Sequence, residues 1–88
     1  MAKWQTDLLK DSTFPFDFAQ LSGDSQALVQ GYIQDVVNIA HPCKDKHAEP
    51  CGNILDGMCL IVFPNSSLRI VIYPEYDRNT IWFVSCRD

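Results

Sequence analysis

The sequence predicts an α+β fold in which a helix packs on an antiparallel sheet of three or four strands. Between residues 22 and 40, apolar side chains recur at the three- and four-residue spacing of one helix face. Three short runs rich in Val, Ile, Phe, Trp and Tyr follow, separated by turn-forming residues, and such runs indicate strands. The chain has 88 residues, the length of one small domain, so we expect residues 1–88 to fold as a single unit.

The composition favours a folded protein, because 47% of the residues are hydrophobic and only 20% are charged. The net charge of −4 argues against a main affinity for nucleic-acid phosphate, which clustered Lys and Arg would drive. No apolar run approaches the roughly 18–20 residues that span a bilayer, so no membrane partner is expected. Charged residues within residues 1–20 argue against a signal peptide, and we expect a cytoplasmic protein with reduced cysteines.

Residues 1–21 form an N-terminal segment for which two structures stay open. Residues 3–10 are compatible with a short strand or a helical turn. The alternation of Phe14, Phe16 and Phe18 is typical of a strand, but Pro15 restricts such a segment to a sheet edge or to a non-strand conformation.

The helix is predicted over residues 22–40. Ser22 or Asp24 can cap its first turn, and Pro42 ends it because the residue before a proline avoids helical dihedral angles. Its apolar stripe consists of Leu28, Val29, Tyr32, Ile33, Val36, Val37, Ile39 and Ala40.

The second half of the chain is predicted as a loop and a β-meander. Residues 41–57 contain two prolines and two glycines and are expected to form the loop. Residues 58–88 are expected to form the meander, because short loops join antiparallel neighbours. The predicted strands are Met58–Phe63, Leu68–Tyr73 and Thr80–Cys86.

The loop carries a weak candidate for a metal site, made of His41, Cys43, His47 and Cys51. Zinc binds such nitrogen and sulfur ligands, but the spacing H-x-C-x3-H-x3-C lacks the closely paired cysteines of a zinc knuckle. The favoured interpretation is a loop with incidental His and Cys residues and no cofactor, and a Cys43–Cys51 disulfide is a further alternative. No signature of a nucleophilic cysteine is present, and Cys59 and Cys86 are interpreted as buried hydrophobic residues.

The meander carries the polar residues that could perform chemistry. The planar fork of an arginine donates paired hydrogen bonds to phosphate, and Arg69, Arg78 and Arg87 all lie in this region. Arg69 begins its strand and Arg87 ends the next one, so we expect antiparallel pairing to place them near opposite ends unless the register or a bend compensates. The alternative is that each arginine is a solvated or ion-paired residue at a sheet edge.

Over roughly residues 24–88 the chain resembles the RelE/ParE superfamily of toxin–antitoxin systems. The resemblance rests on a helix that ends near a proline-bearing loop, the segment Ile54–Gly57, the strand R-I-V-I-Y at Arg69–Tyr73, and a last strand ending at Arg87. Members with nuclease activity cut messenger RNA on the ribosome without a metal, using basic and tyrosine side chains on the concave sheet face. Other members act on gyrase, and some are inactive.

The resemblance implies a toxin-related protein, either an endoribonuclease or an inactive relative, with an antitoxin or other protein partner. Arg69 and Arg87 match the family's arginines and would grip the scissile phosphate and stabilise its developing charge. Tyr73 would be the third catalytic residue, and Arg78 and Tyr76 would bind the substrate.

The sequence departs from the family in ways that support a second hypothesis. The strand at residues 58–63 has no basic residue, the net charge is −4, and the chain stops at Asp88 where the family supplies a final tyrosine or histidine. The alternative is a small acidic interaction module or inhibitor, of the kind found in phages and mobile elements, that binds a basic partner surface. Acidic side chains around the arginines would favour this alternative.

Overall fold

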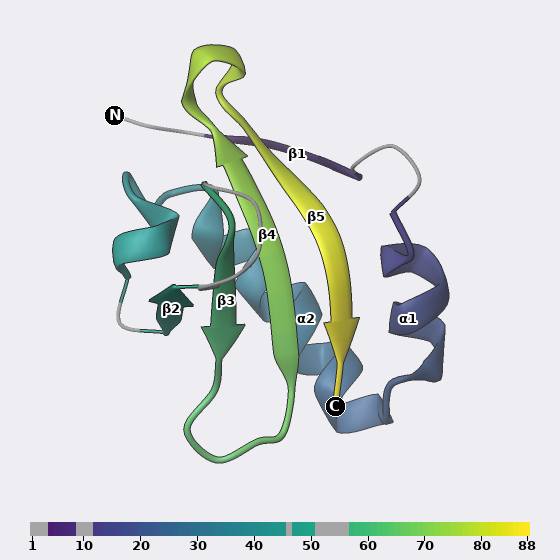
Figure 1. The fold of residues 1–88 in the computed structure, drawn as a ribbon. Helices are drawn as coiled ribbons and strands as arrows, with labels where there is room; N and C mark the ends of the chain where they lie inside the picture. Colours follow the sequence, from purple (N-terminus) through teal and green to yellow (C-terminus); the bar gives the residue numbers. More distant parts are fainter. Residues whose placement is uncertain (1–3, 9–11, 46, 51–56) are drawn as a thin grey trace.

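The computed structural model describes residues 4–8, 12–45, 47–50 and 57–88. The fold is α+β, with α2 lying across one face of a five-stranded sheet (Figure 1). In chain order the elements are β1 (Gln5–Leu8), α1 (Phe14–Gln20), α2 (Gly23–Val36), the 3-10 turn η1 (Pro42–Lys44), β2 (Ala48–Pro50), β3 (Cys59–Val62), β4 (Arg69–Glu75), the 3-10 turn η2 (Tyr76–Arg78) and β5 (Thr80–Arg87).

The sheet is mixed, with the strand order β1-β5-β4-β3-β2. β1 runs parallel to β5, and the other neighbouring strands are antiparallel. The expectation of an antiparallel sheet with three or four strands is therefore wrong in both direction and number. β1 pairs with the last strand of the chain, which no local pattern can indicate, and β2 is a three-residue strand inside the predicted loop.

The helix α2 begins as the sequence predicts and ends earlier. The Ser22 side chain caps it by accepting a hydrogen bond from the backbone N–H of Ser25 at 3.3 Å. The helix ends at Val36 because tertiary hydrogen bonds draw the following residues toward the N-terminal segment. The backbone N–H of Trp4 donates to the carbonyl of Val37 at 2.9 Å, and its indole N–H donates to the carbonyl of Ile39 at 2.7 Å.

The helix α1 replaces the strand-like alternation seen around Pro15. A proline is tolerated in the first turn of a helix, where its missing N–H would have no partner. Phe14 is buried, whereas Phe16 is 70% exposed. The Ser12 hydroxyl lies 2.7 Å from the carbonyl oxygen of Val84, which attaches the start of α1 to β5.

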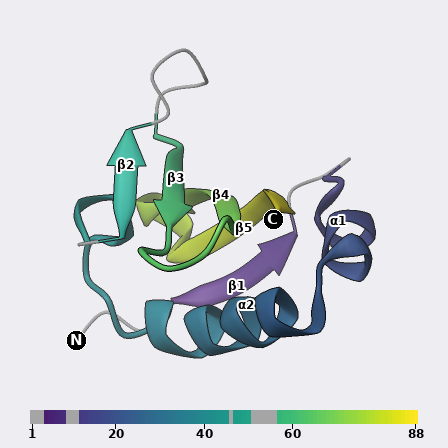
Figure 2. The same cartoon turned by 90° about the horizontal axis from the view of Figure 1, so that it is seen from below.

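The core lies between α2 and the sheet. Ile70 and Ile72 in β4 are fully buried beneath the helix, and each such side chain stabilises the fold by about 1.5–3 kcal/mol. Alternate residues of β4 point to the other face, which no helix covers within the described part of the chain (Figure 2). We call this second surface the open face. The other buried core residues of α2 and the strands are Val29, Tyr32, Val36, Cys59, Ile61, Ile81, Phe83 and Cys86.

A disulfide joins Cys43 in η1 to Cys59 in β3. The expectation of reduced cysteines is wrong for this pair, and so is the Cys43–Cys51 alternative, because the fold places η1 beside β3. Cys51 itself lies outside the described residues. The prediction that Cys59 and Cys86 are buried is confirmed, and Cys86 is a free thiol.

Candidate functional site

A β-bulge in β5 decides which residues reach the open face. Val71 pairs with Ser85 while Ile72 pairs with Phe83, so Val84 is an extra residue without a partner on β4. Without this insertion, strict alternation from Phe83 would place Arg87 on the buried face. The bulge instead turns Arg87 to the open face and buries Cys86.

Arg69 and Arg87 are direct partners across β4 and β5. The expectation that antiparallel pairing would separate them is wrong, because the start of one antiparallel strand lies beside the end of its neighbour. Directly opposed residues have Cβ atoms about 4.5–5.5 Å apart, so the two side chains leave the sheet side by side. The sequence-predicted arginine pair is thus brought together on one surface.

The two arginines line a pocket of about 410 Å³ on the open face. Nη1 of Arg69 donates to the carbonyl oxygens of Leu68 at 2.8 Å and Ser66 at 3.2 Å, which fixes the direction of the side chain. Arg87 is exposed. The remaining lining residues are Asp17, Leu60, Val71, Ser85 and Cys86.

Asp17 brings a carboxylate to the same pocket from α1. Its Oδ2 accepts hydrogen bonds from the Thr13 hydroxyl at 2.7 Å and from the backbone N–H of Cys86 at 3.3 Å. These bonds tie the carboxylate to the end of β5. Sequence reasoning missed Asp17, because only the packing of α1 against β5 brings it to the arginines.

Among the described residues neither Arg69 nor Arg87 forms a salt bridge, and the Asp17 carboxylate in the same pocket offsets only one of their two positive charges. Like charges directly opposite in a sheet destabilise it, so the pairing of the two charges does not itself stabilise the sheet. An anion between the two guanidinium groups would remove that repulsion, and phosphate oxygens fit their planar donor geometry. The arrangement is therefore suited to hold a phosphate group.

The other predicted site residues lie toward the opposite end of β4. Tyr73 is on the open face four residues from Arg69, about 13 Å along the strand. Arg78 lies in η2, where its Nε is 3.8 Å from Oε2 of Glu75. Oε1 of Glu75 accepts a hydrogen bond from the indole N–H of Trp82 at 2.9 Å. Tyr73 and Arg78 therefore do not join the arginine pair.

Tyr76 belongs to an aromatic cluster at that same end of the sheet. Its ring makes an edge contact with Trp4 at a centroid distance of 5.0 Å, and its hydroxyl lies 3.2 Å from Nδ1 of His41. These contacts hold Trp4 and His41 against η2. Tyr76 therefore packs within the aromatic cluster and does not reach the pocket of Arg69 and Arg87.

The weak candidate for a metal site is described at three of its four residues, His41, Cys43 and His47, and each of them contacts a different partner. Cys43 is bonded to Cys59, His41 contacts Tyr76, and His47 packs against Phe63 at a centroid distance of 5.4 Å. In the ranges that the structure describes, no group of three or more His, Cys, Asp or Glu side chains could hold a metal ion.

Cys86 is placed near the arginine pocket but is poorly suited to act as a nucleophile. Burial, together with the carboxylates of Asp17 and Asp88, raises the pKa of its thiol to about 11. The reactive thiolate is therefore scarce at neutral pH.

Comparison with known proteins adds no relative to this description. No protein-family profile, curated protein or solved structure matches the chain. Of the helices in the described segments, none has the length and apolar character needed to cross a membrane.

Proposed function

We propose that this chain is a RelE/ParE-like, toxin-related protein that binds messenger RNA through the Arg69–Arg87 pair on the open face. The observation that supports the proposal is the direct pairing of these two arginines across β4 and β5. By the resemblance, the same arginines would stabilise negative charge on a scissile phosphate, so the proposed activity is metal-independent RNA cleavage. An antitoxin would be the protein partner.

The electrostatics of the chain limit how tightly it can bind RNA alone. Two phosphate contacts on a single strand correspond to a salt slope of about −1.4 in log K against log salt. A net charge of −4 further opposes association with a polyanion. The proposal therefore includes the ribosome as the surface that presents the RNA, and we expect binding to free RNA to be weak and salt-sensitive.

Action on ribosomes would place the protein in the cytoplasm, where glutathione and thioredoxin keep thiols reduced. The proposal therefore requires that the fold survives reduction of the Cys43–Cys59 bond.

The proposal is tested with the double variant Arg69→Ala/Arg87→Ala and the control Arg78→Ala. Arg78 lies at the far end of the sheet and is paired with Glu75, so its removal should leave RNA binding unchanged. Fluorescence anisotropy with a short single-stranded RNA at low salt measures affinity and its salt slope. Inducible expression in bacteria, followed by growth curves and messenger RNA integrity, measures activity on ribosomes.

We expect the double variant to lose RNA binding and to restore growth and intact messenger RNA, while Arg78→Ala behaves as wild type. If the wild type arrests growth and the double variant loses both RNA binding and growth arrest, the result supports the nuclease. Binding by the wild type without RNA cleavage supports an inactive relative. Equal RNA binding by the wild type and the double variant would contradict the assignment of the site.

A second candidate function is an acidic interaction module that binds a basic protein surface. The observation that favours it is Asp17, whose carboxylate lines the pocket of the two arginines and adds to a chain with a net charge of −4. Such a module would bind poly-lysine in a salt-dependent manner and would not bind RNA. The same anisotropy assay with labelled poly-lysine separates the two candidates.

A further inference from the structure

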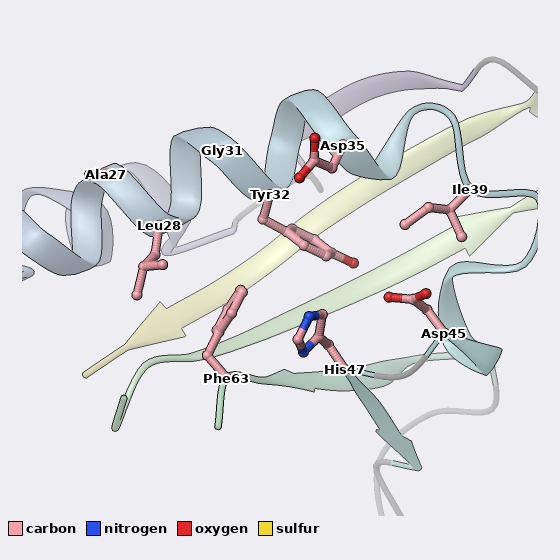
Figure 3. Close-up of a pocket in the computed structure, with 9 residues that line it drawn as sticks. All are labelled: Ala27, Leu28, Gly31, Tyr32, Asp35, Ile39, Asp45, His47 and Phe63. Carbon is pink, nitrogen blue, oxygen red and sulfur yellow. The ribbon is translucent and has the colours of Figure 1, made fainter. Parts of the chain in front are cut away.

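A second pocket, of about 340 Å³, lies on the helix side of the sheet, away from the arginine pair. It is bounded by α2, by Asp45 and His47 between η1 and β2, and by Phe63 after β3 (Figure 3). Its volume lies within the range of about 300–1,000 Å³ that small-molecule sites occupy.

The Tyr32 hydroxyl is the unusual feature of this pocket. Tyr32 is only 6% exposed, and its hydroxyl has no hydrogen-bond partner within the described chain. The ring extends from α2 toward Asp45 and Ile39, with His47 beside it (Figure 3). Burying a hydroxyl without a partner costs stability, so a ligand that supplies the missing hydrogen bond would be favoured there.

The charge of the pocket selects the kind of ligand. Asp35 and Asp45 line it, and His47 is the one basic residue among the described residues of its lining. Burial and the negative charge of Asp45 raise the pKa of Tyr32, so the hydroxyl stays neutral at physiological pH. The charge of the described lining therefore favours a cationic ligand. The described His, Cys, Asp and Glu side chains offer no cluster for a metal ion, which leaves an organic cation.

The walls of the pocket are suited to an apolar body. The Tyr32 and Phe63 rings meet edge to face at a centroid distance of 6.0 Å, and the His47 ring lies 5.4 Å from that of Phe63. Leu28 and Ile39 add aliphatic surface. Aromatic faces also attract an ammonium group directly.

We propose that this pocket binds a small primary amine with an apolar body. The ammonium group donates hydrogen bonds to the Tyr32 hydroxyl and to the Asp45 carboxylate, and the apolar body packs against Phe63 and Ile39. The Tyr32 hydroxyl is closed off in the free protein, so the side chains around it have to shift for the ligand to reach it. This site is independent of the proposed RNA-binding function.

The test uses three probes that share a phenyl ring on a short chain and differ in charge. Phenethylamine is positive, phenethyl alcohol is neutral and 3-phenylpropionate is negative at neutral pH. Titration of the folded protein is followed by amide chemical shifts, which locate the site, and by calorimetry, which gives the affinity. The variants are Asp45→Asn and Tyr32→Phe. The control is Asp24→Asn, which removes the same charge from the first turn of α2, outside the pocket.

We expect saturable binding of phenethylamine with a Kd of about 1 mM or tighter, and shifts centred on Tyr32, Asp45 and Phe63. The alcohol and the Asp45→Asn variant should each show affinity at least about tenfold weaker, because a charge-assisted hydrogen bond is lost. Tyr32→Phe should also bind more weakly. Asp24→Asn and Arg69→Ala/Arg87→Ala should bind as the wild type.

Equal affinity for the amine and the alcohol would overturn the proposal, because it would show an apolar cavity without charge selection. Shifts that do not saturate, or that centre outside this pocket, would overturn it as well. If Asp45→Asn does not fold, the comparison of the three probes on the wild type decides the question alone.

Discussion

The disulfide between Cys43 and Cys59 is expected to contribute a large part of the stability of this small protein. It attaches η1 to β3 and closes a loop with a sequence separation of 16. The loop-closure relation for a cross-link of this length gives about 3 kcal/mol at 25 °C. A chain of 88 residues has a total stability of roughly 4–13 kcal/mol, so reduction removes between about a quarter and three quarters of it.

The expected loss corresponds to a change in melting temperature that is easy to measure. Each kcal/mol shifts the Tm of a domain of this size by roughly 4–8 °C, so reduction should lower Tm by roughly 12–24 °C. The purified protein is melted with and without a phosphine reductant, and the midpoint is followed by circular dichroism. The intact mass before and after reduction verifies the state of the bond.

The control variant is Cys43→Ser, which removes the half-buried partner and leaves Cys59 as a buried thiol. It should melt near the temperature of the reduced wild type, and the reductant should have no further effect on it. Cys86 is a buried free thiol, so it should not add to the response.

A difference in Tm below about 4 °C between the oxidised and the reduced protein would refute the reasoning. It would show that the packing of η1 alone already restricts the loop. The proposed cytoplasmic function requires that the fold survives reduction of this bond. A reduced protein that still melts cooperatively well above 37 °C would satisfy this requirement.

Three further predictions concern the core, a turn and a terminal carboxylate. Ile72→Ala should lower the free energy of unfolding in urea by about 2–5 kcal/mol, because Ile72 is fully buried; a loss below about 1 kcal/mol would contradict the placement of the core. Gly57→Ala should cost more than about 1 kcal/mol, because Gly57 has φ of +93° and an added Cβ would lie 2.8 Å from Cε1 of Tyr73; an equally stable variant would argue against this backbone conformation. Asp88→Asn should destabilise the protein at neutral pH. The backbone N–H of Ser22 donates to the Asp88 carboxylate at 2.9 Å and, with further side-chain hydrogen bonds, lowers its pKa. This stabilisation is lost as the pH falls through the lowered pKa, so wild type and variant should unfold alike once the pH is below it, and a constant difference at all pH values would contradict it.

Local patterns predicted the elements whose signals lie within a short stretch of chain. The helical stripe containing Val29, Tyr32 and Val36 gave α2, and the capping residue Ser22 gave its start. Alternation and β-branched residues gave most of β3, β4 and β5. The end of α2 was missed because hydrogen bonds from Trp4, which lies far away in sequence, determine it.

The candidate site was likewise predicted from the sequence where the signal was local and missed where it depended on distant contacts. The sequence supplied the two arginines as candidates, because their donor geometry suits phosphate. It misplaced them relative to each other, because the start of one antiparallel strand lies beside the end of its neighbour. Their exact pairing and their common face depend on strand register and on the bulge at Val84. Asp17 in the same pocket, and the unpartnered Tyr32 hydroxyl in the other, gave no local signal.

The sequence by itself determined the α+β class, the position of the main helix and the residues with the chemistry to hold a phosphate. Periodicity and side-chain chemistry are properties of neighbouring residues, so they can be read without coordinates. Only the tertiary structure decided that β1 runs parallel to β5, that Cys43 meets Cys59, and that Arg87 lies beside Arg69. Each of these depends on contacts between segments that are distant in sequence. In β5, for example, one extra residue reverses which side chains face outward, and this decides where Arg87 lies.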